Sequence, residues 1–496
     1  MKNKITLIIV TLLLSVTSFA QNVFMERGYF KSNPSLEQVK KDIAAGNDPT
    51  EMNSGAFDPV VFAILDKVDN EIILHLLKQE GNDVNKNTHD GRTYAFWAAL
   101  RSNFEVLEYL VANGADMNHI DDKGSPVMHF AAGAGVSDTR IYDLCIENNK
   151  EGIHQKNKYG ANVFLYIASN LKDDTLIKYF TSKGLDIHST DDNGDGIFNY
   201  ASKKINQDFL NLLIEKGVDY KSLNNIGGNA FINASNGIRI GINDLEDFKY
   251  LESLGLNPNI TTKNGVTPLH WAALRDKDGA LITYFIEKGV DVNQADSNGN
   301  TAFINAASGN TLKNIALISK HNADVNAQNK EGQTAIMKAV QRNSLEVIGY
   351  LLSNGADASI KDTEGNSLAH YLIAGYRSNN VEVFNQKLDV LKKTGLDFTE
   401  QQSKGDNLWH LAVKRNDMYL LETVQSLDVD INIKNDDGLT PLHLAAMKAI
   451  DTKALEYLIK NGADKSVTTD FEESVYDLAQ ENELLQQTNT DLNFLK

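Results

Sequence analysis

The stretch GVTPLHWAAL, from Gly265 to Leu274, places a threonine, a histidine and a tryptophan close together. Thr267 and His270 are residue types that can form a proton relay, supply a metal ligand or cap a helix. A catalytic histidine has no reason to recur along a chain, yet five of the eleven histidines occupy this same position of a recurring stretch. We therefore expect them to bond their own hairpin and the backbone of the neighbouring repeat. They are His129, His270, His370, His410 and His443.

A second stretch with ligand chemistry is DDNGDG, from Asp191 to Gly196. It matches the first half of a calcium-binding loop, with oxygen donors on alternate residues. The second half is missing, because Ser202 stands where a bidentate glutamate is needed. The segments DSNGNT (296–301) and NDDGLT (435–440) hold the same place in the repeat, so turn formation explains all three. We expect no metal ion and no cofactor.

Signatures of enzymes are missing from the sequence. It contains no Gly-x-Ser-x-Gly elbow, no phosphate loop, no His-Glu-x-x-His and no convergent Cys/His set. The lone Cys145, in IYDLCIEN, has no second cysteine with which to form a disulfide and sits among helix-spaced apolar residues. We interpret it as a small buried hydrophobe, and the chain as a non-catalytic protein.

The 496 residues are organised as one repeated unit. We define the frame glycine as the glycine two residues before Thr267 and its equivalents in the other copies. These glycines are 33 to 40 residues apart, a period typical of a solenoid of small supersecondary units. They are Gly91, Gly124, Gly160, Gly194, Gly227, Gly265, Gly299, Gly332, Gly365, Gly405 and Gly438.

The motif resembles that of the ankyrin repeat family, most closely in GVTPLHWAA (265–273) and GLTPLHLAA (438–446). Weaker copies include GRTYAFWAA, GSPVMHFAA, GNTAFINAA, GQTAIMKAV and GDNLWHLAV. With a degraded first copy at FDPVVFAIL and a degraded last copy at ESVYDLAQE, the resemblance covers most of the chain. It implies an all-α fold, an α-solenoid of about thirteen stacked helix-turn-helix repeats joined by hairpin-like loops.

Each copy also has a local physical logic. Thr267 can cap a helix, and Pro268 fits the first helical position, where its missing N–H is not needed. The second helix, GALITYFIEKG, ends at Gly289, which can adopt the left-handed conformation. An aromatic residue follows the histidine position in the early copies, where packing against the adjacent repeat or a binding face would both suit it. These aromatic residues are Trp97, Phe130, Tyr166, Tyr200 and Trp271.

The two ends of the chain differ from the repeats. Residues 1–20 have a basic start, an apolar core and a Ser-Phe-Ala cleavage site, which predicts a secretory signal peptide too short to span a bilayer. Residues 21–52 form an N-terminal capping segment, with a lone helix closed by Gly46. We expect the repeat solenoid over residues 53–485 and a tail over 486–496, so the mature chain enters no membrane.

The net charge of the chain limits the kinds of macromolecule that it can bind. The formal net charge is −18, and no basic run or RNA-binding signature is present, which argues against nucleic acid. The negative field favours a basic partner or serves solubility. We expect the chain to be monomeric on its own and secreted or periplasmic.

The ankyrin resemblance implies that loop tips and first helices bind a partner protein along a concave face. Three copies are longer than the rest, and their extra residues either add contacts or reflect neutral length drift. We expect a protein-interaction scaffold or, alternatively, a non-catalytic protective or regulatory subunit of an extracytoplasmic enzyme. The motif positions expected to be exposed are Arg92, Leu100, Arg101, Lys263, Asn264, Val266, Arg275 and Asn300. The insertions add Ile238, Ile240, Tyr376 and Arg377.

Overall fold

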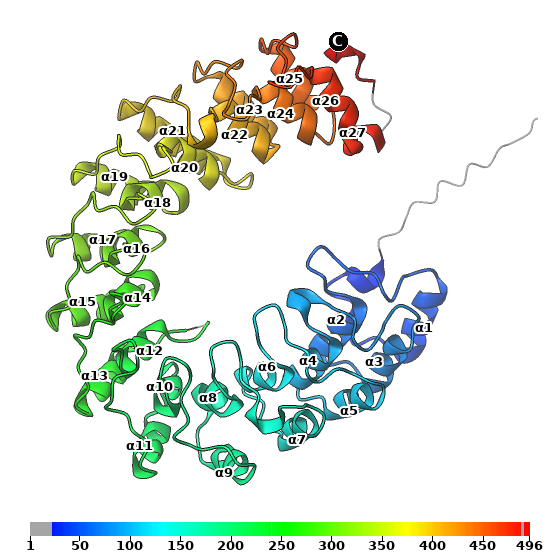
Figure 1. Cartoon of the computed structure of the whole chain (residues 1–496), viewed down its shortest axis with the longest axis vertical. Coiled ribbons are helices and arrows are strands. Elements are labelled where there is room, and N and C mark those ends of the chain that lie inside the picture. The colour runs from blue at the N-terminus through cyan, green and yellow to red at the C-terminus, as the bar shows by residue number, and fades with distance from the viewer. Residues whose placement is uncertain (1–21, 240, 488–490) are drawn as a thin grey trace, which may run out of the picture. The chain divides into compact units, whose positions relative to one another are not determined.

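The computed structural model describes residues 22–239, 241–487 and 491–496 (Figure 1). The predicted signal peptide and the candidate Ile240 lie outside the described residues. The chain divides into two compact units. Unit 1 consists of Met1–Ala201 with Asp208–Asp219, and unit 2 of Ser202–Gln207 with Tyr220–Lys496.

The described residues form 27 α-helices. Those that lie in unit 1, wholly or mostly, are α1 (Leu36–Ala44), α2 (Pro59–Asp66), α3 (Asn70–Leu77), α4 (Tyr94–Leu100), α5 (Phe104–Ala112), α6 (Val127–Gly133), α7 (Thr139–Glu147), α8 (Val163–Ile167), α9 (Thr175–Ser182), α10 (Ile197–Ser202) and α11 (Gln207–Glu215).

The helices of unit 2 are α12 (Ala230–Asn236), α13 (Leu245–Ser253), α14 (Pro268–Arg275), α15 (Ala280–Glu287), α16 (Ala302–Ala307), α17 (Leu312–Ser319), α18 (Ala335–Arg342), α19 (Leu345–Ser353), α20 (Leu368–Gly375), α21 (Val381–Lys393), α22 (Leu408–Arg415), α23 (Met418–Gln425), α24 (Pro441–Lys448), α25 (Lys453–Lys460), α26 (Val475–Glu481) and α27 (Glu483–Gln487).

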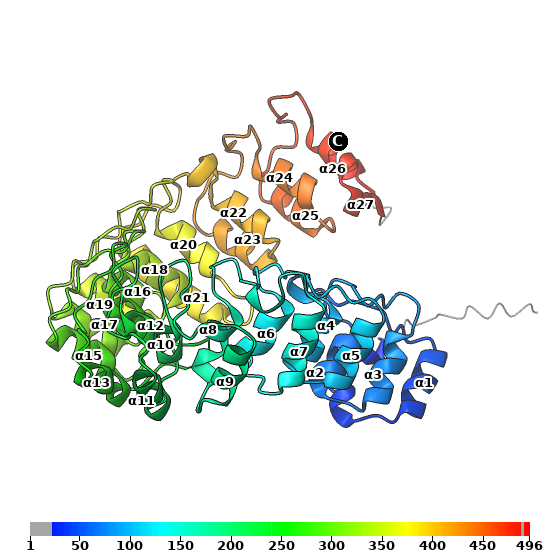
Figure 2. The ribbon, with the colours of Figure 1, turned by 60° about the horizontal axis from the view of Figure 1, so that its bottom comes forward.

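Helix pairs stack in a row within each unit (Figures 1 and 2). First helices of successive repeats pack on one another, as α4 does on α6 and α14 on α16, and second helices do the same. In the described part of the chain, β-pairing is limited to isolated bridges such as Thr88–Arg92. The apolar core runs along the stack, so the expected all-α solenoid is confirmed.

The helices begin and end where the sequence predicts. Thr267 is the N-cap of α14, with Pro268 in the first turn, and Thr440 and Pro441 repeat this arrangement at α24. Gly289 follows α15 with φ = 82°, and Gly46 follows α1 with φ = 97°. Cap residues and left-handed glycines thus set the helix boundaries locally, while burial of the apolar faces stabilises the stack.

The motif histidines connect neighbouring repeats. At α14 the main-chain N–H of Thr267 donates to His270 Nδ1 (3.1 Å), so the ring proton lies on Nε2, which donates to the carbonyl of Asn300 (3.0 Å). His410 bonds in the same way to Leu439, and His443 to Val467, each at 2.9 Å. Burial lowers the pKa of all three rings, so they stay neutral near pH 7. For these three histidines, the expected bonds to their own hairpin and to the neighbouring repeat are confirmed.

Two motif histidines lack the bond to their own cap among the described residues. Pro126 occupies the position of Thr267 before His129 and offers neither hydroxyl nor N–H. Before His370, the N–H and hydroxyl of Ser367 donate instead to Gln402 of the next repeat (2.8 and 3.2 Å). His129 still reaches across to the carbonyl of Ala161 at 3.0 Å. At His129, therefore, the cross-repeat bond persists without a bond to the cap.

The hairpin loops are also bonded to one another. Within unit 1, the N–H of Asp122 donates to the carbonyl of Asp90 (2.9 Å), and within unit 2 that of Lys330 donates to Asn298 (2.8 Å). Adjacent hairpins lie so close that a Cβ on Gly265 would meet the carbonyl oxygen of Ala295 at 2.1 Å. The row of loops in each unit is thus a bonded surface rather than a set of separate tips.

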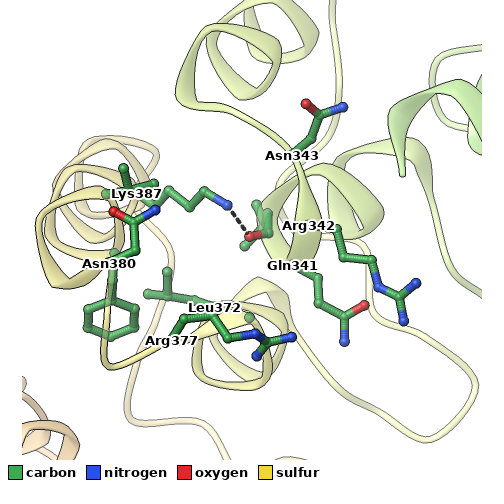
Figure 3. Close-up of a pocket in the computed structure, with 11 residues that line it drawn as sticks. Gln341, Arg342, Asn343, Leu372, Arg377, Asn380 and Lys387 are labelled. Carbon is green, nitrogen blue, oxygen red and sulfur yellow. Dashed lines mark hydrogen bonds between the residues drawn. The ribbon is translucent and has the colours of Figure 1, made fainter. Parts of the chain in front are cut away.

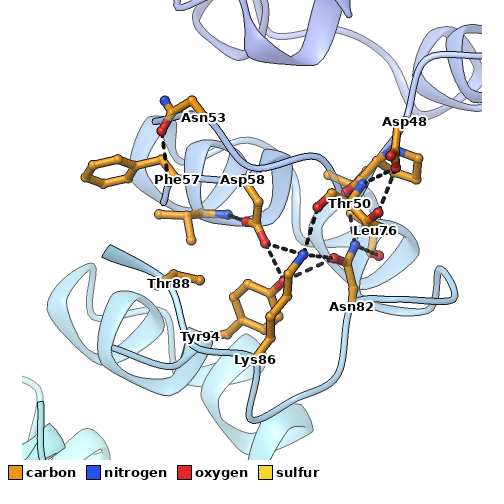
Figure 4. A network of polar contacts seen from close by, with 12 residues as sticks. Asp48, Thr50, Asn53, Phe57, Asp58, Leu76, Asn82, Lys86, Thr88 and Tyr94 are labelled. Atoms are coloured by element: carbon orange, nitrogen blue, oxygen red, sulfur yellow. Dashed lines mark hydrogen bonds and ion pairs between the residues drawn. The ribbon is translucent and has the colours of Figure 1, made fainter. Parts of the chain in front are cut away.

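The first repeat of unit 1 is built around a buried charge (Figure 4). The fully buried Asp58 caps α2 through the N–H of Val61 (2.9 Å) and pairs with Lys86 (3.0 Å). The Tyr94 hydroxyl donates to the same carboxylate at 2.6 Å. Asn82 Oδ1 accepts from the Lys86 ammonium group at 3.0 Å and lies 3.1 Å from the Tyr94 hydroxyl oxygen. The carboxylate is therefore satisfied from several directions, as a buried charge requires.

The early aromatic residues and the cysteine have mixed surroundings. Trp97 and Tyr200 are buried, and the Trp97 indole donates to Thr88 Oγ1 at 2.8 Å. Phe130, Tyr166 and Trp271 are half-buried, so the packing interpretation holds fully for only two of the five. Cys145 is buried as expected, and desolvation raises the pKa of its thiol to about 12.

Candidate protein-binding surface

The most exposed aromatic side chains stand at hairpin tips. We define the tip residue as the one immediately before a frame glycine. Tyr159 is the tip residue before Gly160 and is 57% exposed. In the last hairpin Glu472 takes the frame-glycine position with φ = 65°, and its tip residue, Phe471, is 85% exposed. Each unit thus presents one aromatic ring at a tip. Exposure of such an apolar ring to water is unfavourable, which marks it as a binding feature.

The backbone beneath these rings is held in place. Asn157 Oδ1 accepts from the N–H of Tyr159 (2.9 Å), whose carbonyl accepts from Asp192 of the next hairpin (3.1 Å). The N–H of Phe471 donates to Thr469 Oγ1 at 3.2 Å. An aromatic ring on a fixed backbone loses little conformational entropy on binding, which is the property of a good anchor residue.

Some of the residues predicted from the sequence do lie on the surface. Lys263 and Asn264 are exposed at the hairpin before α14, and Asn264 is itself a tip residue. The Lys263 amine donates to the carbonyl of Asn225 at 2.9 Å, which ties two hairpins together. Val266 and Leu100 are half-buried, and Arg101 is exposed after α4. None of these positions has been tested as a contact, so they stay predictions.

The expectation that Arg92 is exposed is wrong. It is 8% exposed, pairs with Asp121 at 2.9 Å and Asp90 at 3.1 Å, and lies 4.3 Å from the centre of the Phe130 ring. The two aspartates hold the guanidinium between two hairpins, so it connects repeats. Asn300 is half-buried for a similar reason: its carbonyl accepts from His270, and its side-chain oxygen accepts from Asn329 at 3.0 Å.

The expectation that Tyr376 is an exposed contact is also wrong. The ring is 3% exposed and packs against Phe384 and Tyr419, with ring centres 5.1 and 6.1 Å apart. Arg377 is exposed, and one of its nitrogens donates to the Tyr376 carbonyl at 2.8 Å. The insertion therefore turns its aromatic residue inward and its arginine outward.

One motif position, ten residues after the frame glycine, holds an arginine in several repeats. Arg275 follows the 38-residue copy, and its guanidinium binds the carbonyls of Asn236, Ile238 and Gly241 in the inserted loop. Arg415 follows the 40-residue copy and donates to the carbonyl of Tyr376 at 3.0 Å. Half-buried Arg275 thus secures a loop and is not the fully exposed position that was expected.

Sequence reasoning missed Tyr159 and Phe471. The signal was available, because every other tip residue except Ile226 is polar or charged. These polar tip residues are Asp90, Lys123, Asn193, Asn264, Asn298, Glu331, Glu364, Lys404 and Asp437.

Metal binding finds no support in the arrangement of the described residues. They contain no group of three or more His, Cys, Asp or Glu side chains arranged to hold a metal ion. Asp191, the first residue of the calcium-like stretch, accepts from the N–H groups of Asn193 and Asp195, both at 2.9 Å. It therefore shapes a turn. None of the helices in this part of the chain has the length and hydrophobicity to span a bilayer.

Comparison with known proteins gives one family. A family model described as "Ankyrin repeats (3 copies)" matches residues 60–151, 238–329, 269–362, 311–390 and 372–469, more than half of the chain. An ankyrin repeat protein of fowlpox virus is 29% identical over 154 residues, which make up 30% of this chain and 77% of that protein. The crystal structure of the human ASB11 ankyrin repeat domain matches 45% of this chain and 96% of that one, with 21% identity and a TM-score of 0.38.

Longer relatives match through a small part of their length. The E3 ubiquitin-protein ligase KEG of Arabidopsis thaliana is 23% identical over 264 residues, 50% of this chain. Human transient receptor potential cation channel subfamily A member 1 is 33% identical over 81 residues, 16% of this chain. The chain spans 16% of the length of the ligase and 7% of that of the channel.

Proposed function

The chain belongs to the ankyrin-repeat family, and from this premise we propose that it is an extracytoplasmic scaffold that binds a basic partner protein through its hairpin tips. The observation that carries the proposal is the placement of Tyr159 and Phe471 at tips with fixed backbones. Ankyrin repeats act as protein-interaction modules, and exposed aromatic anchors are the residue type that dominates binding energy at such surfaces.

The charge of the chain supports a basic partner. Acidic side chains outnumber basic ones by 66 to 48, and several tip residues, such as Glu331, Glu364 and Asp437, are acidic. Asp470 and Glu472 flank Phe471, and a negative rim around an aromatic anchor accelerates encounter with a positive surface and rejects a negative one. Binding should therefore weaken as salt rises.

The location outside the cytoplasm rests on the sequence of residues 1–20 alone. Their basic start, apolar core and small-residue cleavage site are typical of an exported protein. Fractionation of the native cell with N-terminal sequencing tests this part. The proposal requires a mature chain outside the cytoplasm that begins near Gln21; a cytoplasmic chain that retains Met1–Lys4 would overturn it.

The partner is tested by affinity capture from the cell envelope, followed by mass spectrometry. The variants are Tyr159→Ser and Phe471→Ser, and the matched control is Asn298→Ser, at an exposed tip that is already polar and is not a candidate contact. We expect the partner to be lost with one aromatic variant and retained by the control. Retention by both aromatic variants would contradict the proposal. A single stoichiometric enzyme would identify the chain as a regulatory subunit, whereas several partners would identify a general scaffold.

A further inference from the structure

The lengthened repeat of unit 2 lines a cavity of about 450 Å³ that is partly open to solvent. It lies among the end of α18, the end of α20 and the first turns of α21, which at 13 residues is longer than α19 or α23. Gly375 allows the close approach that shapes it, since a Cβ there would meet the Gln341 carbonyl oxygen at 2.4 Å. The extra residues of this repeat thus build a pocket as well as a loop.

Lys387 occupies one wall of this cavity (Figure 3). The residue is 7% exposed, and its amine donates to the main-chain carbonyl of Val340 at 2.8 Å. Burial lowers the pKa of the ammonium group, and no acidic side chain offsets this. An uncompensated buried lysine costs stability, so its presence in a cavity calls for a role that stability does not explain.

The hydrogen bond to Val340 explains only part of the placement of the Lys387 ammonium group. Val340 lies in the last turn of α18, where a cation interacts favourably with free carbonyls. An ammonium group has three donors, however, and helix capping uses one of them. It also leaves unexplained why two arginines, Arg342 and Arg377, line the same cavity.

The lining combines positive charge with apolar surface. Arg342, Arg377 and Lys387 are cationic, and no carboxylate stands among the described residues that line the cavity. This is a local reversal of sign in a chain with a net charge of −18. Leu372, Val383 and Phe384 form an apolar part of the wall, beside the amides of Gln341, Asn343 and Asn380.

We propose that this cavity binds a carboxylate joined to a small apolar group. The ammonium and the planar guanidinium groups are the natural partners of a carboxylate, and the apolar wall would cover the body of the ligand. The volume is within the range of small-molecule sites. Two sources share this chemistry, a free organic acid and the C-terminal residue of a peptide.

The probe is N-acetyl-leucine, with its neutral amide as the matched ligand control, titrated calorimetrically into the full mature chain. We expect the acid to bind about ten- to a hundredfold more tightly than the amide, because charge-assisted hydrogen bonds contribute that much to affinity. A glycine-rich tripeptide ending in leucine tests the source. If the tripeptide binds more tightly than N-acetyl-leucine, the natural ligand is the C-terminal residue of a peptide. If it binds more weakly, the natural ligand is a free organic acid.

Lys387→Met keeps most of the side-chain volume and removes the charge. We expect it to weaken binding of the acid at least tenfold and to raise the melting temperature, since a buried unpaired charge is lost. Lys338→Met, on α18 but outside the lining, should leave binding unchanged.

Four results would overturn the proposal. They are no binding of either carboxylate at millimolar concentration, equal binding of acid and amide, binding of inorganic phosphate as tight as that of the acid, and unchanged binding in Lys387→Met. A purely capping lysine would give the last of these together with a lower melting temperature.

Discussion

The first repeat of unit 1 and the motif-bearing repeats that follow it in both units are joined to neighbouring repeats by different chemistry. In unit 1 a buried carboxylate, Asp58, is held by Lys86 and Tyr94 from the following repeat (Figure 4). In unit 2 neutral rings, such as His270 and His443, donate to carbonyls of the next hairpin. The helix-hairpin backbone is alike in both.

The difference shows that the repeat fixes where a cross-repeat polar contact lies but not what it is made of. A charged contact depends on every partner, because a charge left alone in the interior is costly. A hydrogen bond from a neutral histidine contributes less to stability, and it is perturbed when the ring takes up a proton. The two regions should therefore respond to different perturbations.

The largest effect is expected for Asp58→Ala. It leaves the Lys86 ammonium without its carboxylate and the Tyr94 hydroxyl without its acceptor at 2.6 Å. We expect a loss of about 3–5 kcal/mol in the free energy of unfolding, measured by urea denaturation. Asp69→Ala, an exposed position before α3, is the control and should change little. Equal losses in both variants would remove the distinction between the regions.

Acid should act through the histidines. Desolvation lowers the pKa of the fully buried His129 to about 4, against 6.5 for a free ring. Between these values the unfolded chain binds a proton that the folded chain does not, so stability falls as pH drops from 6.5 to about 4. The loss is about 3 kcal/mol, measured by urea denaturation across this range. His129→Gln should lack this contribution, and an unchanged slope would contradict the assignment.

A smaller effect separates two histidines of unit 2. His443→Ala removes bonds to Thr440 and to Val467, and we expect a loss of about 1–3 kcal/mol in the free energy of unfolding. His370 has no cap partner on Nδ1 among the described residues, since Gln402 takes the donors of Ser367. His370→Ala should therefore cost less than His443→Ala in the same melt, and the reverse order would be inconsistent with the cap geometry.

The smallest effect concerns the inserted loop. Arg275→Met removes donors to the carbonyls of Asn236, Ile238 and Gly241. We expect about 1 kcal/mol or less in global stability, but faster amide hydrogen exchange around this loop. Arg342 holds the same motif position after a repeat of ordinary length and is exposed, so Arg342→Met is the matched control. Unchanged amide hydrogen exchange in Arg275→Met would show that the loop is ordered without the arginine.

The fold was predictable because its causes are local. The cap at Thr267, the proline at Pro268 and the left-handed Gly289 are readable from residue type, and the period of the frame glycines predicts stacking. The cross-repeat role of the histidines followed from their recurrence alone.

The surface was less predictable because exposure depends on neighbours one repeat away. Arg92 is buried because Asp121, 29 residues later, packs against it. No local sequence pattern predicts this ion pair. Tyr376 turns inward onto Tyr419 of the following repeat for the same reason. The cavity beside Lys387 depends on the length of α21 and on one glycine contact, neither of which composition reveals.

The central claim is that the motif histidines serve the stack while recognition lies at the hairpin tips. NMR titration of the histidine rings, with and without one equivalent of Zn²⁺, tests this most directly. The account predicts that His129, His270, His370, His410 and His443 all titrate below the free value of about 6.5 and do not shift with zinc. One of the five that titrates like free histidine, or moves when zinc is added, would contradict it.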